Sequence, residues 1–130
     1  MLNLLIKTDQ PLAGLYLFED MKPLYRHEWQ ADKELAESIN REIDFVLKES
    51  QKKMTDLEGI GIFSGPGSFT GLRIGHSVAN ALAYGLSLPI SSGKGKSWQK
   101  QALTSLLSGE NEVLAMPDYG RDARITTPRK

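Results

Sequence analysis

Residues 59–90 read GIGIFSGPGSFTGLRIGHSVANALAYGLSLPI, and this stretch decides the fold. It opens with a run of β-forming residues that ends at Phe63, and a loop with two glycines and a proline follows. From Gly71 the pattern predicts an apolar helix, which has no charged residue after Arg73 and ends at Pro89, because proline cannot continue a helix. Strand, glycine loop, helix and next strand therefore fit within about thirty residues, the size of a βαβ unit.

Three short strands are predicted upstream, over residues 2–6, 12–18 and 23–29, because runs of β-forming residues alternate there with turn residues. Their two short turns are typical of an antiparallel meander. Apolar residues then recur at helical spacing between charged ones over residues 35–47. This spacing predicts an amphipathic helix, with Asp32 as its N-terminal cap.

After the central stretch, the sequence predicts a short strand at Ile90, a helix over residues 97–107 and one more strand over residues 113–116. We expect one lobe, residues 1–116, and a polar and basic tail, residues 117–130. Three antiparallel strands followed by parallel ones predict an α/β fold with a mixed five-stranded sheet flanked by helices. This order is that of ribonuclease H-like domains and of the half-domain duplicated in actin-like ATPases.

The composition limits the classes of function. The 130 residues include no cysteine, so neither a disulfide framework nor a thiolate metal site is available. The net charge is zero, but residues 1–90 carry 9 basic and 12 acidic groups, and residues 91–130 carry 7 and 4. A neutral chain is a poor stand-alone nucleic-acid binder. Neither a signal peptide nor an apolar run of ~20 residues is visible. We therefore expect a cytoplasmic protein without a membrane partner.

The inventory of reactive residues predicts no catalytic site. A ribonuclease H-type nuclease needs several carboxylates around Mg²⁺ at strand ends, and only Asp9 follows the first strand. A zinc peptidase needs paired histidines, whereas His27 and His76 are far apart in the sequence. A nucleophile–base pair of Ser68 and His76 would have to meet across a loop and a helix. We therefore expect no catalytic residue and no metal.

The glycine loop supports two interpretations. Backbone N–H groups at a helix N-terminus bind phosphate, so the loop can hold an anion or a nucleotide. The candidate residues for this role are Gly67, Ser68, Thr70 and Arg73. Alternatively, the glycines only allow a tight turn between strand and helix. The loop is not a Walker A motif, because no Gly-Lys-Ser/Thr follows at the required spacing.

Small residues recur every four positions along the central helix. The members of this small-residue row are Gly71, Gly75, Ala79 and Ala83. They line one face, where another helix can approach closely. A second face carries Ile74, Val78, Ala81 and Leu82. One apolar face has to cover the sheet. We expect the small-residue row to contact a helical partner, and packing against the chain's own first helix is the alternative.

The segment GPGSFTGLRIG, residues 65–75, resembles the signature of the TsaB (YeaZ) family. The strand before it and the alanine-rich helix after it agree with that family, and the resemblance covers residues 1–91. TsaB proteins help bacteria to make threonylcarbamoyladenosine beside the anticodon of tRNA. The resemblance implies an actin-like fold of two related halves, of which this chain contains the first. It also implies no catalytic activity, since most members have none known.

The resemblance implies a partner subunit that pairs through the two helices of the first half. The expected partner is a homologous TsaD-like subunit, which carries the metal and transfers the threonylcarbamoyl group. A TsaE-like ATPase joins the pair, and TsaC supplies the activated intermediate. A homodimer is an alternative, and tRNA is reached only through the complex. The expected interface residues are Leu35, Ile39, Ile43, Leu72, Gly75, His76, Ala79 and Ala83.

Two features differ from the family pattern. Lys7, Thr8 and Asp9 follow the first strand where the family has Asp-Thr-Ser, so no nucleotide cofactor is expected. The chain also ends where the second half of the family begins. A different class of function stays open, namely a small domain that holds a nucleotide phosphate in the loop from Gly65 to Arg73. The basic residues of 117–130 either contact tRNA in a complex or form a solvated tail.

Overall fold

The predicted antiparallel meander is present in the computed structural model, which describes residues 1–120 of the chain. It consists of β1 (Leu2–Lys7), β2 (Leu12–Glu19) and β3 (Lys22–Gln30), in which β2 pairs with both neighbours. β4 (Gly59–Phe63) pairs with β1 in parallel, and β5 (Ile90–Gly93) pairs with β4 in parallel. The strand order is β3-β2-β1-β4-β5, which confirms the mixed five-stranded sheet.

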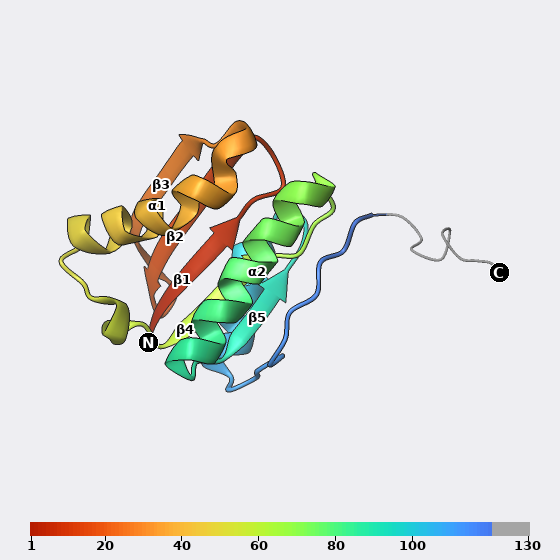
Figure 1. Ribbon diagram of the computed structural model, residues 1–130. Coiled ribbons are helices and arrows are strands. Elements are labelled where there is room, and N and C mark those ends of the chain that lie inside the picture. The colour runs from red at the N-terminus through yellow and green to blue at the C-terminus, as the bar shows by residue number, and fades with distance from the viewer. Residues whose placement is uncertain (121–130) are drawn as a thin grey trace.

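Helices cover both faces of this sheet. α1 (Leu35–Glu49) and α2 (Phe69–Leu86) lie on one face, and α3 (Trp98–Leu107) lies on the other (Figure 1). β1 runs through the middle of the sheet, and it carries apolar residues on both faces. Successive side chains of a strand point to opposite faces. Leu4 accordingly packs with α1 and α2, Leu5 packs with α3, and both are fully buried.

The helix boundaries differ in part from the predicted ones. α2 begins at Phe69, two residues before Gly71, because the Ser68 side chain accepts a hydrogen bond from the Gly71 N–H and caps the first turn. Asp32 does not cap α1. It lies in a short 3-10 turn (Asp32–Glu34) with a positive φ, and its carboxylate accepts a hydrogen bond from the Gln30 side chain.

Residues 111–120 form an extended segment, here called the strap, and not the predicted strand over residues 113–116. The strap runs beside β5 and α2 and ends next to the glycine loop (Figure 1). At its far end the Asp118 N–H donates to the Ser64 carbonyl oxygen, 2.7 Å away, and Asp118 pairs with Lys94. Residues 117–120 are therefore part of the folded lobe, whereas the predicted tail residues 121–130 lie outside the described residues.

Within residues 1–120, no helix combines the length and the apolarity that crossing a membrane requires.

Candidate partner surface and glycine loop

The glycine loop between β4 and α2 is bound to the end of β1. The Ser68 N–H donates a 2.8 Å hydrogen bond to the Asp9 carbonyl oxygen. Gly67 lies so close to Asp9 that a Cβ atom on Gly67 would overlap it. The loop therefore makes a tight strand-to-helix turn, in which a glycine is needed for a close approach between two backbone segments.

A buried carboxylate lies beside this loop. Asp9 is only 6% exposed, and the Lys7 ammonium lies 2.6 Å from its Oδ1 atom. The same ammonium lies 4.8 Å from the centre of the Phe63 ring, a cation–π geometry. Lys7 is thus already engaged by an acid and a ring. An anion on this side of the loop would meet the Asp9 carboxylate.

The four candidate anion-binding residues do not converge on one point. Ser68 and Thr70 line a cleft of about 870 Å³ between the N-terminal ends of α1 and α2. Gly67 faces Asp9 instead. The Arg73 guanidinium is solvent-exposed and lies 5.5 Å from the centre of the Phe69 ring.

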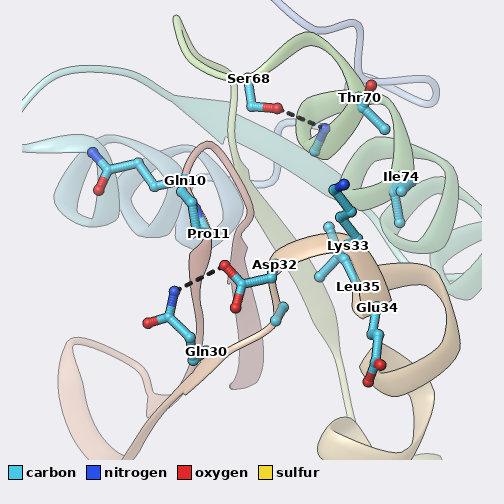
Figure 2. Close-up of a pocket in the computed structure, with 12 residues that line it drawn as sticks. Gln10, Pro11, Gln30, Asp32, Lys33, Glu34, Leu35, Ser68, Thr70 and Ile74 are labelled. Carbon is cyan, nitrogen blue, oxygen red and sulfur yellow. Dashed lines mark hydrogen bonds between the residues drawn. The ribbon is translucent and has the colours of Figure 1, made fainter.

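The opposite wall of this cleft comes from the β1–β2 turn and from the segment between β3 and α1. Figure 2 shows Ser68 and Thr70 on the α2 side, and Gln30 with Asp32 across the cleft. Lys33 also lines the cleft. All of these polar side chains are exposed, and the charges are of both signs. The geometry of the cleft therefore selects no ligand class.

The eight residues predicted to form the partner interface do not lie on the surface. Each of the eight is buried inside this chain, so none of them is available to a partner: Leu35, Ile39, Ile43, Leu72, Gly75, His76, Ala79 and Ala83. The three α1 residues belong to the hydrophobic core under that helix, and the small-residue row of α2 faces the sheet. A Cβ atom on Gly75 would overlap the Thr8 side chain, and a Cβ atom on Gly71 would overlap the Thr8 carbonyl oxygen.

The exposed surface of the two helices is made by other residues. A groove of about 290 Å³ lies between α1 and α2. It is lined by Asn40, Ser77, Val78, Ala81 and Leu82. Farther along α2, Tyr84 is 90% exposed. The outward positions Ser77, Ala81 and Tyr84 carry no charge, although a solvated helix face normally does. This absence of charge after Arg73 is the signal that could have located the groove from the sequence.

Residues 1–120 can be compared with two catalytic arrangements, a metal site and a nucleophile–base pair. Within this range, no three histidine or carboxylate side chains lie close enough together to hold a metal ion. Ser68 and His76 do not form a nucleophile–base pair in this structure. The Ser68 hydroxyl caps α2, while His76 is buried and its Nδ1–H donates to the Leu72 carbonyl oxygen at 2.8 Å. Burial lowers the pKa of His76 below its ordinary value of 6.5.

These features place the protein in the class of ribonuclease H-like α/β lobes. The exposed face of α2 carries no charge after Arg73. The structure superposes on YeaZ from Pseudomonas aeruginosa with a TM-score of 0.64 and 23% identity, over 69% of this chain and 42% of that chain. A second structure, described as an uncharacterized protein with similarity to peptidase YEAZ from Pseudomonas aeruginosa, gives a TM-score of 0.65. These superpositions support the fold.

Sequence comparison identifies the family. A TsaB from Haemophilus influenzae is 34% identical over 107 residues, which are 78% of this chain and 43% of the relative. A tRNA N6-adenosine threonylcarbamoyltransferase from Chromobacterium violaceum is 33% identical over 69% of this chain and 31% of its own length. The profile of the TsaD family (tRNA N6-adenosine threonylcarbamoyltransferase) matches residues 29–92. The chain belongs to the TsaB (YeaZ) family, and it spans less than half the length of these two relatives.

Proposed function

We propose that this chain acts in the threonylcarbamoyladenosine modification of tRNA as a non-catalytic partner subunit. In this role it binds a TsaD-like threonylcarbamoyltransferase through the surface of α1 and α2 and reaches tRNA only within that complex. The family supports the pathway, since the relatives include a tRNA threonylcarbamoyladenosine biosynthesis protein and a tRNA N6-adenosine threonylcarbamoyltransferase. A TsaE-like ATPase joins the pair in this proposal.

One observation carries the proposed contact, namely the uncharged outer face of α2 beside the α1–α2 groove. Exposed helix faces are usually charged, and an exposed apolar patch rimmed by polar groups is typical of a protein interface. Of the residues that line the groove, Asn40 and Ser77 are polar and exposed, and Val78 and Leu82 are apolar and half-buried. Ala81 is small, so a partner helix can approach the backbone of α2 closely.

The segment matched by the TsaD profile, residues 29–92, contains both helices of this surface. A partner of the same fold would present a similar helix pair. Two such pairs can pack as a four-helix contact, in which an apolar side chain of the partner fills the α1–α2 groove. A second copy of this chain offers the same geometry, so a homodimer competes with the heterodimer for one surface.

The test is complex formation between this chain and the TsaD-like subunit of the same organism, followed by gel filtration and calorimetry at micromolar concentration. We expect a heterodimer for the unaltered chain. Ala81→Arg should abolish it while leaving the circular dichroism spectrum unchanged, because a buried unpaired charge costs several kcal/mol and about 1.4 kcal/mol changes Kd tenfold.

Thr104→Arg is the matched control, because Thr104 is an exposed residue of α3 on the other face of the sheet. This variant should bind as tightly as the unaltered chain. The proposal fails if no complex forms at micromolar concentration, or if Ala81→Arg binds normally. Sedimentation of the chain alone then reports whether the surface serves a homodimer.

The alternative function, a phosphate site from Gly65 to Arg73, is separated by calorimetry with ATP and ADP. Two contacts weigh against it: Asp9 occupies one side of the loop, and Arg73 stacks on Phe69. Micromolar nucleotide binding that Arg73→Ala removes would favour this alternative over the partner subunit.

A further inference from the structure

The strap is attached to the lobe at three places. At its start, the Glu112 N–H donates to the Ile90 carbonyl oxygen at 2.8 Å. In the middle, Asn80 of α2 makes two 2.9 Å hydrogen bonds with the backbone of Ala115, one to its N–H and one to its carbonyl oxygen. At its end, Asp118 is held next to the glycine loop. The strap is thus hydrogen-bonded both to the edge of β5 and to α2.

His76 lies one helical turn before Asn80, so both side chains project from the same side of α2. His76 is 3% exposed. Its Nδ1–H donates to Leu72, and its Nε2 atom is buried without a hydrogen-bond partner among the described residues. A neutral ring tolerates this arrangement at the cost of one unsatisfied acceptor. A protonated ring would bring a buried positive charge and a donor with no acceptor.

The elements around His76 offer few groups that could compensate such a charge. β4 and β5 carry no titratable side chain, and the only charge of α2, on Arg73, is exposed. From the strap, the Glu112 carboxylate acts on His76 and favours its protonated form. That carboxylate is engaged by β5, since it accepts a 2.7 Å hydrogen bond from the Ser92 N–H and a 2.8 Å one from its hydroxyl.

We propose that the strap is a pH-sensitive latch, in which protonation of the buried His76 ring releases the strap from β5 and α2 so that the charged ring becomes accessible to water. The protonated Nε2–H then donates to water, and the Ser92 N–H loses its hydrogen bond to the Glu112 carboxylate. Because Ala115 follows Glu112 by three residues, this movement also strains the two Asn80 hydrogen bonds. The core of the lobe, which depends on the sheet and on α1 to α3, stays folded.

The direction of the pH dependence follows from burial. In the folded state the pKa of His76 is lowered, chiefly by burial, while the Leu72 carbonyl and Glu112 raise it. In the opened state the pKa returns to about 6.5. The opened strap therefore binds more protons, so the closed strap is fully stable above pH 6.5 and loses stability as the pH falls below it.

Amide hydrogen exchange followed by NMR tests this latch in the whole chain. After correction for intrinsic exchange rates, protection of the Ser92 and Ala115 amides should fall by up to tenfold for each pH unit below 6.5. Protection of the Leu4 amide in the central strand should not change between pH 7.5 and pH 5.5. The proposal is overturned if Ser92 and Ala115 keep their protection at pH 5.5.

His76→Phe is the variant that removes the titrating group, and it should make the protection of both amides independent of pH. Equal loss of protection in this variant would overturn the latch. If His76→Phe fails to fold, direct titration of the His76 ring in the unaltered chain decides the matter, since a pKa at or above 6.5 contradicts the proposal. Glu112→Gln should lower the pKa of His76 further, because it removes the carboxylate that raises it.

Discussion

Thr8, which follows β1, donates a 2.8 Å hydrogen bond from its hydroxyl to the carbonyl oxygen of Gly71 in the first turn of α2. One turn later, Gly75 packs against the same threonine side chain without room for a Cβ atom. These contacts hold α2 close to the end of β1. They explain why small residues recur along the face of α2 that covers the sheet.

Gly75→Ala should destabilise the protein. Overpacking a close contact costs about 1–3 kcal/mol, and this cost exceeds the gain of up to about 1 kcal/mol from replacing a helical glycine by alanine. Thr8 cannot rotate away without breaking its bond to Gly71. Urea unfolding should therefore show a lower midpoint.

Gly85→Ala is the control for that substitution, because no atom lies within 4 Å of a Cβ atom placed on Gly85. This variant should be equally or more stable than the unaltered chain. A double-mutant cycle adds Thr8→Ala, which should reduce the cost of Gly75→Ala. Equal effects of Gly75→Ala and Gly85→Ala would contradict the role given to Thr8.

Ala79→Arg should unfold the chain rather than block a partner. Ala79 is 0% exposed and packs in the core between α2 and the sheet. An arginine there would place an unpaired charge in an apolar interior, which costs several kcal/mol. We expect no cooperative unfolding transition by circular dichroism for Ala79→Arg. A folded Ala79→Arg protein would show that the small-residue row is accessible after all.

Asn80→Ala should detach the middle of the strap. The variant loses both hydrogen bonds to Ala115 and leaves two buried backbone groups without partners, at about 1–3 kcal/mol each. Chymotrypsin should then cleave at Leu114, which is already exposed, faster than in the unaltered chain. Ser77→Ala, an exposed position on the same helix, should leave both stability and cleavage unchanged. Identical cleavage of the two variants would contradict the role of the Asn80 side chain in holding the strap.

Glu28 provides a pH prediction on the other face of the sheet. The Tyr16 hydroxyl donates a 2.9 Å hydrogen bond to the Glu28 carboxylate and lowers its pKa below the ordinary value of 4.5, helped by Arg26 and opposed by burial. The carboxylate therefore stabilises the folded state above pH 4.5, and this contribution is lost as the pH falls below that value.

Tyr16→Phe should raise the pKa of Glu28 towards 4.5, as measured by NMR titration of the carboxyl carbon. The dependence of stability on pH below 4.5 should become weaker in this variant. Tyr84→Phe is the control, because that hydroxyl lies on an exposed residue of α2. An unchanged Glu28 titration in Tyr16→Phe would show that another group sets this pKa.

Most of the fold could be predicted from local patterns. Helical spacing located α1, and the run of β-formers before a glycine loop located β4 and α2. The strap could not be predicted in this way. Residues 113–116 are apolar enough for a strand, but Asn111 and Glu112 bind the edge of β5 through their side chains as well as the Glu112 backbone. No periodicity within the sequence shows such a contact.

The candidate site, too, could be predicted from the sequence only in part. The motif from Gly65 to Gly75 is a property of the sequence alone, and it was sufficient to identify the family. The sequence also showed that α2 has two apolar faces, but not which one covers the sheet.

The sequence by itself thus determined the order of the elements, the family and the absence of charge along α2 after Arg73. Only the tertiary structure decided which residues a partner can meet. Thr8 is sixty-three residues away from Gly71 in the chain, yet its hydroxyl donates a hydrogen bond to the Gly71 carbonyl oxygen. The small-residue row therefore packs against the sheet. That long-range contact turns Ser77 and Ala81 outward, because opposite faces of a helix cannot both be buried by one sheet.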